Sequence, residues 1–303
     1  MYKLEFPLYV VISYIALAII GILGNFTIIL ITITNKCLHS RCYILIALMA
    51  CFNFVYCIYA AQLRVMILIN ESVMSSSTCF LISIYGIFAM NMQSLLALFI
   101  GIDRVYVIVY PGKYAKLSIN YYYLMVTLCA LISLLVTFCK FVFYSDEVVT
   151  NCLLSTALHG IPFKIWQFMN FFITVAVIFV YSLAHINFQT LKKSTVHMKT
   201  AKSVDRIMKS MLIVIAFYVC TWTLGLCGMF LSQFLQADDI HAFIIQKLSG
   251  WLVLSNSSLN VFIYFWRTPD YRKAILKLFG ISKSVVDSRI HVSYMPNNPV
   301  AIF

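Results

Sequence analysis

The chain has 303 residues, of which 62% are hydrophobic and 11% are charged. A water-soluble domain carries roughly 25% charged residues, because its surface must face water. An apolar surface in water would aggregate, so the composition excludes a soluble protein and predicts that lipid surrounds most of the chain. The net charge of +12 does not indicate a nucleic-acid partner, because the basic residues stand in short gaps between apolar segments rather than in one patch.

Seven segments are apolar and long enough to cross a membrane as helices, which takes about 20 residues each. They lie at about 8–34, 43–69, 77–109, 121–143, 163–190, 206–235 and 241–266. Helices are expected because an open strand edge in lipid would leave backbone groups unpaired. The sequence therefore predicts an all-α membrane protein, a seven-transmembrane helix bundle. The first span is too long for the core of a signal peptide and is expected to act as a signal anchor.

The basic residues indicate how these spans are oriented. All but five of the 22 Lys and Arg residues fall on the side that is cytoplasmic when the N-terminus is outside, and cytoplasmic loops carry such an excess. The five exceptions are Lys3, Arg64, Lys140, Lys164 and Lys247. Residues 1–7 are then a short extracellular N-terminus, and residues 267–303 are a cytoplasmic tail. Within this tail, apolar residues recur at helical spacing over about 269–279, which predicts a short amphipathic helix in the inner membrane interface.

Ten cysteines are present, and most of them fall inside apolar segments, where a thiol is a small packing residue. Only Cys79 and Cys152 stand at the outer edges of spans, in the compartment where a disulfide could persist. No group of Cys and His residues has the spacing of a zinc site. We therefore expect neither a metal nor a cofactor.

The pair Asp103-Arg104 lies at the inner end of the third span, where a charge is costly and needs a reason. Pro111 follows the arginine by seven residues. This spacing resembles the rhodopsin-like G-protein-coupled receptors, whose third helix ends in Asp-Arg-Tyr with a proline seven residues after the arginine. Val105 replaces the tyrosine here. On these residues alone, an ordinary ion pair at the interface is the alternative.

Other motifs of that family occur in the same order along the chain. A Gly-Asn pair ends at Asn25 in the first span, and Asn53 stands where the second helix usually has an aspartate. Trp222 is similar to the tryptophan of the sixth-helix Cys-Trp-x-Pro element. Asn260 and Tyr264 resemble the first and last residues of the seventh-helix Asn-Pro-x-x-Tyr element.

The resemblance also implies a disulfide. In that family a cysteine lies 25 residues before the arginine, and counting back from Arg104 gives Cys79. Its partner in the second outer loop would be Cys152, so that the loop is tied to the third helix. Two free thiols are the alternative.

The chain departs from the family in the residues that bend its helices. No proline follows Trp222, none lies midway through the fifth span, and Val261 replaces the seventh-helix proline. Proline kinks a helix by removing a backbone hydrogen bond, so straighter helices than in the family at large are expected. Asn53 also removes a carboxylate, so the interhelical polar cluster is expected to hydrogen-bond between helices but to bind sodium poorly. Its members are Asn25, Asn53, Gln93, Asn256, Ser257 and Asn260.

The resemblance implies a receptor that binds an extracellular ligand and activates a heterotrimeric G protein. Gly86 and Leu254 stand where amine receptors have an aspartate and opsins have a lysine, so neither an amine nor retinal is supported. Activation would separate Arg104 from Asp103, with Tyr181 and Tyr264 moving toward the arginine. Helix position alone selects the pocket candidates, although each could equally pack between helices. These candidates are Tyr85, Met90, Trp166, Trp222 and Trp251.

Residues 100–104 and 110–114, read with the short N-terminus and the compact third inner loop, are similar to the nematode chemosensory receptors of serpentine receptor class sx. This likeness implies a chemosensory receptor in the plasma membrane, in a sensory cilium. An orphan peptide receptor, a polytopic transporter or channel, and a membrane enzyme stay open as alternatives. Asn70-Glu71-Ser72 is a possible glycosylation acceptor in the first outer loop.

Overall fold

The computed structural model describes residues 7–143, 147–194, 213, 216–232, 234–235 and 240–280. The elements in chain order are α1 (Leu8–Thr34), a 3-10 turn (Lys36–Leu38), α2 (Arg41–Leu68), β1 (Met74–Ser75), α3 (Ser76–Val109), α4 (Pro111–Ala115), α5 (Ile119–Val142), β2 (Val148–Val149), α6 (Leu154–Ala157), α7 (Ile161–Ser194), a π-helical turn (Val219–Thr223), α9 (Leu224–Leu231), α10 (Ile240–Ser258), α11 (Asn260–Arg267) and α12 (Pro269–Leu278). The predicted sixth span is described from Ala216 to Leu231 as a shorter apolar helix, and residues 206–212 lie outside the described part of the chain.

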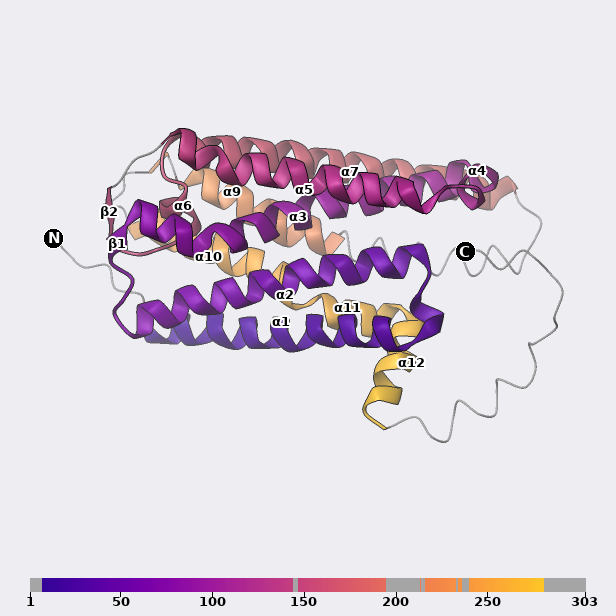
Figure 1. The fold of residues 1–303 in the computed structure, drawn as a ribbon, viewed down its shortest axis with the longest axis horizontal. Coiled ribbons are helices and arrows are strands. Elements are labelled where there is room, and N and C mark those ends of the chain that lie inside the picture. The colour runs from indigo at the N-terminus through magenta and orange to yellow at the C-terminus, as the bar shows by residue number, and fades with distance from the viewer. Residues whose placement is uncertain are drawn as a thin grey trace.

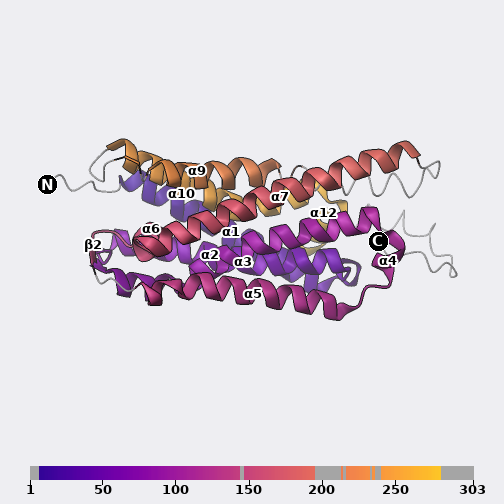
Figure 2. The same ribbon diagram turned by 90° about the horizontal axis from the view of Figure 1, so that it is seen from above.

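The long helices form one bundle along a common axis (Figures 1 and 2). Helix α3 is central, because it contacts α2, α5 and α7, while α1 packs against α2 and α10 packs against α9. The β1–β2 pair and α6 lie at one end of the bundle, and α4 lies at the other (Figure 1). Helix α12 turns away from the bundle axis at the α4 end.

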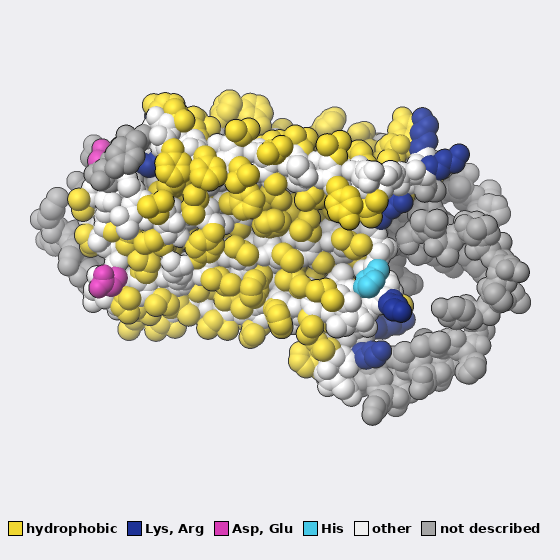
Figure 3. Space-filling view, viewed as in Figure 1, with side chains coloured by type: hydrophobic (Ala, Val, Ile, Leu, Met, Phe, Trp, Pro, Cys, Tyr) yellow, Lys and Arg dark blue, Asp and Glu magenta, His cyan; other side chains and the backbone are white. Residues whose placement is uncertain are grey.

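The outer surface of the bundle is apolar between its two ends. Helices α1, α2, α3, α5 and the part of α7 up to Thr190 are each long and apolar enough to cross a membrane. Large side chains such as Leu135 and Phe179 are 73% and 66% exposed, which only lipid tolerates over so wide a surface. Acidic side chains are visible at the β1–β2 end, whereas most of the visible Lys and Arg side chains gather at the opposite end (Figure 3). This distribution matches the orientation expected from the sequence, with the α4 end in the cytoplasm.

The seventh span is not one continuous helix, although it has no proline. It breaks at Leu259, between α10 and α11. The Nδ2 group of Asn25 donates to the carbonyl of Ser257 at 2.9 Å, and the hydroxyl of Ser255 donates back to the carbonyl of Trp251 at 2.9 Å. Side chains that enter the backbone hydrogen-bond ladder bend a helix without proline.

The sixth span also contains an irregularity where the family has a proline. Residues Val219–Thr223 form a π-helical turn that carries Trp222. The hydroxyl of Thr221 donates to the carbonyl of Phe217 at 2.7 Å, so a side chain again competes with the backbone ladder. An expanded turn of this kind is one of the few recognised causes of a bend within a helix.

Helix α12 is anchored to the inner end of the bundle by its tyrosine. Tyr271 is fully buried, and its ring lies 5.3 Å from the ring of Tyr43 and 5.4 Å from that of Tyr264, between centroids. The hydroxyl of Tyr43 donates to Asp270 at 2.7 Å. Pro269 occupies the first turn, where a missing N–H costs nothing. The segment expected to form an amphipathic helix at 269–279 is therefore helical to Leu278.

Candidate functional site

The inner end of α3 carries a buried ion pair. The Nε group of Arg104 donates to Oδ2 of Asp103 at 3.1 Å, and its Nη2 group contacts the same oxygen. The hydroxyl of Tyr122, from α5, donates to the other carboxylate oxygen at 2.7 Å. Asp103 and Arg104 are only 3% and 9% exposed. Both carboxylate oxygens are thus engaged, which a buried carboxylate requires.

The start of α2 holds this region through a second arginine. Arg41 donates to the carbonyls of Tyr114 and Leu117 at 3.0 and 2.9 Å. Its guanidinium also lies 5.4 Å from the ring of Tyr114 and 5.6 Å from that of Tyr122. Burial and the charge of Asp103 raise the pKa of the Tyr114 phenol, so it stays protonated. In the sequence, Arg41 served only as one of the basic residues that orient the spans in the membrane, and Tyr122 was not selected. Neither residue belongs to a recognisable motif.

A cavity of about 50 Å³ lies within the bundle. Ile100, one helical turn before the ion pair on α3, is among the residues that line it. The cavity is large enough for at least one water molecule. Polar and aromatic side chains from six helices meet on its walls, and they include six residues that the sequence analysis selected. These are Asn53, Gln93, Tyr181, Asn256, Asn260 and Tyr264. We call this space the inner cavity.

Polar contacts join the helices around the inner cavity. The hydroxyl of Ser257 donates to Oε1 of Gln93 at 3.1 Å, and Nε2 of Gln93 donates to the carbonyl of Phe52 at 3.2 Å. Asn25 lies further along the same network, where it binds the carbonyls of Gly21 and Ser257. The predicted cluster therefore links α1, α2, α3 and α10 through hydrogen bonds.

The two tyrosines expected to move on activation both line the inner cavity. The hydroxyl of Tyr181 donates to the carbonyl of Ala97 at 3.3 Å. Its ring packs against Gly101, where an added Cβ would lie only 2.7 Å from the ring. Trp222 does not line the cavity but stacks on Tyr218, which does, with 5.9 Å between ring centroids. Tyr218 thus lies between Trp222 and the inner cavity.

A second cavity, of about 80 Å³, lies toward the opposite end of the bundle. Its walls come from α1, α2, α3, α9, α10 and the loop that contains α6. We call it the outer cavity. Arg64 and Lys247 line it together with three tyrosines. These five residues were not among the pocket candidates, which were chosen from helix position alone. The charge of Arg64 inside an apolar span was a signal that pointed to them.

Only one of the five predicted pocket residues, Met90, lines the outer cavity. Trp166 and Trp222 are completely buried, and Nε1 of Trp166 donates to Oδ1 of Asn91 at 2.9 Å, so this indole packs between helices. Tyr85 contacts Oε1 of Gln62 through its hydroxyl. Trp251 is 41% exposed on the outside of the bundle.

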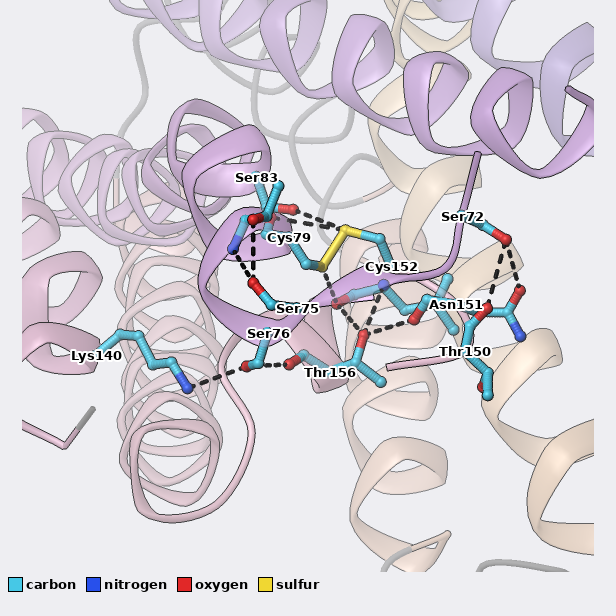
Figure 4. Close-up of a disulfide and its surroundings, with 12 residues drawn as sticks. Ser72, Ser75, Ser76, Cys79, Ser83, Lys140, Thr150, Asn151, Cys152 and Thr156 are labelled. Carbon is cyan, nitrogen blue, oxygen red and sulfur yellow. Dashed lines mark hydrogen bonds between the residues drawn. A yellow bond between two sulfur atoms is a disulfide. The ribbon is translucent and has the colours of Figure 1, made fainter. Parts of the chain in front are cut away.

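A disulfide joins Cys79, at the outer end of α3, to Cys152 in the loop between α5 and α7 (Figure 4). The same loop pairs with the first outer loop through β1 and β2, with Met74 opposite Val149. Ser76 donates to the carbonyl of Thr156 at 3.2 Å and accepts from Nζ of Lys140 at 3.2 Å. These contacts hold the loop over the outer cavity, whose wall includes residues 153–155.

The comparison with protein families agrees with this architecture. Residues 18–279 match the family described as serpentine type 7TM GPCR chemoreceptor Srsx. The matched region begins within α1 and reaches the end of α12, and it includes the Asp103-Arg104 pair, the inner cavity and every lining residue of the outer cavity except Tyr14. No curated protein matches the chain. Because the family match covers most of its length, the chain belongs to the Srsx family of serpentine seven-transmembrane G-protein-coupled chemoreceptors.

Proposed function

We propose that this chemoreceptor binds a small extracellular ligand in the outer cavity and activates a heterotrimeric G protein through Arg104. The observation that carries the proposal is the spacing of the two cavities on α3. Met90 lines the outer cavity and Gln93 lines the inner one, so they are three residues apart on one helix. A ligand that displaces α3 at Met90 would therefore also change the packing around Gln93, since close-packed interiors transmit displacement.

In the proposed mechanism, the ligand binds one arrangement of the helices more tightly than the other and shifts the population toward it. Arg104 then leaves Asp103 and meets the G protein, while Tyr181 and Tyr264 move into the space beside it. The polar cluster of the inner cavity exchanges hydrogen-bond partners during this change. The irregular turn at Trp222 gives the sixth span a place to bend without proline.

We further propose that the receptor acts in the plasma membrane, in a sensory cilium, and that Asn70 is glycosylated. Asn70 is exposed in the turn after α2, on the side assigned to the exterior. A small molecule is favoured over a peptide because the outer cavity is small and the disulfide-linked loop forms part of its wall. Because the chain belongs to a receptor family, the transporter and enzyme alternatives no longer apply.

Coupling can be tested with the purified receptor in lipid nanodiscs and with purified heterotrimers from each main class of Gα subunit. Basal nucleotide exchange by at least one heterotrimer is expected to be several-fold faster than with empty nanodiscs. Exchange that stays at the rate of empty nanodiscs for every heterotrimer would contradict the proposal. A fluorescence size-exclusion profile on the same samples reports whether the receptor is folded.

Replacing Tyr122 by phenylalanine should raise basal exchange by roughly tenfold, since a hydrogen bond to a charged group contributes about 1.5–3 kcal/mol and 1.4 kcal/mol corresponds to a factor of ten. The change removes the hydroxyl that binds Asp103 and keeps the ring that packs against Phe99. The exposed Tyr123 provides a matched control as Tyr123→Phe. Equal basal rates in both variants would show that the hydroxyl does not restrain the ion pair.

A further inference from the structure

The outer cavity carries two positive charges. Arg64, from α2, is 8% exposed, and Lys247 enters from α10. Among the described residues that line this cavity, none is an aspartate or a glutamate. Two like charges on the walls of one cavity repel each other, and the repulsion is stronger where protein rather than water surrounds them. An anionic ligand between them would relieve this repulsion.

The guanidinium of Arg64 is held in place by aromatic contact. It lies 4.1 Å from the centre of the Tyr14 ring, within the range of a cation–π interaction. The hydroxyl of Tyr14 in turn donates to the backbone carbonyl of Lys247 at 2.5 Å. One residue of α1 therefore positions an arginine of α2 and the backbone of α10. A planar guanidinium that is fixed in this way matches the geometry of a carboxylate.

The remaining walls of the outer cavity suit an organic body rather than an inorganic ion. Tyr56 and Tyr59 contribute aromatic rings, and Leu63, Met90 and Met229 contribute apolar surface. Phosphate or sulfate would leave most of its oxygens against these groups, which is unfavourable. A carboxylate attached to an aliphatic or aromatic group has one charged end and one apolar end, as the cavity has.

A contact at the cavity rim connects this chemistry to the outer loop. Nε2 of Gln246, next to Lys247 in α10, donates to the hydroxyl of Ser155 at 2.6 Å. Ser155 lies in α6, close to the disulfide at Cys152. A ligand held by Lys247 would therefore lie beside the contact that joins α10 to the loop.

From these observations we infer that the outer cavity selects small organic carboxylates, with Arg64 binding the carboxylate and Lys247 adding a second positive charge. The inference rests on the proposed role of the outer cavity as the ligand site.

The test uses purified receptor and pairs of probes that differ only in charge: hexanoate with hexanamide, benzoate with benzamide and phenylacetate with phenylacetamide. Binding is measured as a shift in thermal stability and as a Kd. At least one carboxylate is expected to stabilise the receptor, and its amide is expected to bind at least about tenfold more weakly. Equal binding of acid and amide, or no binding of any of the three carboxylates at millimolar concentration, would overturn the inference.

Variants locate the binding site. Arg64→Gln and Lys247→Gln should each raise the Kd of the carboxylate at least about tenfold. Lys164→Gln is the matched control, because Lys164 is exposed near the outer end of α7 and does not line the cavity. Lys247 is the less buried of the two, so its variant tests the inference even if Arg64→Gln fails to fold. Unchanged affinity in Lys247→Gln, or in a folded Arg64→Gln, would contradict the inference and place the carboxylate elsewhere.

The two proposals can fail separately. Carboxylate binding without nucleotide exchange would support the inferred ligand class and contradict G-protein coupling. Exchange without carboxylate binding would contradict the ligand class and leave coupling intact.

Discussion

Replacing Asp103 by asparagine is expected to raise basal G-protein activation roughly tenfold, and replacing Arg104 by alanine is expected to abolish it. Asparagine keeps an acceptor for Tyr122 but removes the charge that holds Arg104. Hydrogen bonds to charged groups contribute about 1.5–3 kcal/mol, and 1.4 kcal/mol changes a population ratio about tenfold. The arginine is then released more often into the arrangement that meets the G protein.

The alanine variant needs a control for folding. Removing Arg104 leaves Asp103 buried without its cation, which costs about 3–5 kcal/mol. The double variant Asp103→Asn/Arg104→Ala removes this charge, so it should reach the cell surface and still fail to activate. Nucleotide exchange and surface labelling are measured together, with the exposed Lys113→Ala as a reference. Activation by the double variant would show that Arg104 is not the coupling residue.

Loss of the disulfide is expected to have the largest effect on stability. Cys79 and Cys152 are 73 residues apart in sequence, and a loop of that length corresponds to a stabilisation of up to about 4 kcal/mol in the chain-entropy account. The bond also holds the wall of the outer cavity. Cys79→Ala and Cys152→Ala should therefore lower the thermal midpoint of the purified receptor and weaken ligand binding.

The effect of the disulfide can be separated from that of removing a thiol. Cys227→Ala removes an exposed free cysteine from α9 and should leave the thermal midpoint unchanged. The double variant Cys79→Ala/Cys152→Ala should be no less stable than either single variant, because one bond is lost in all three. If the decrease in thermal midpoint of the double variant equalled the sum of the decreases of the two single variants, the cysteines would contribute separately rather than through their bond.

Local sequence was sufficient for the membrane class and for five of the long helices. Apolar length alone identified α1, α2, α3, α5 and α7, because a helix in lipid must satisfy its backbone within itself. The Asp103-Arg104 pair was found because a charge beside lipid is rare and its neighbours follow a fixed spacing. The break in the seventh span was not predicted, because Asn25, which donates to a backbone carbonyl there, comes from another helix.

The two cavities depend on which residues distant in sequence come together. Arg64, Tyr14 and Lys247 lie on three helices, and nothing in the local pattern of any one helix indicates that they share a wall. The same holds for Tyr122 and Asp103, which are 19 residues apart and meet across α3 and α5. Composition and the length of the apolar segments are enough to establish a bundle of helices surrounded by lipid, with an arginine at the inner end of the third helix. The positions of the two cavities and the charges that line them depend on how the helices rotate and pack against one another, which the apolar pattern of a single helix does not specify.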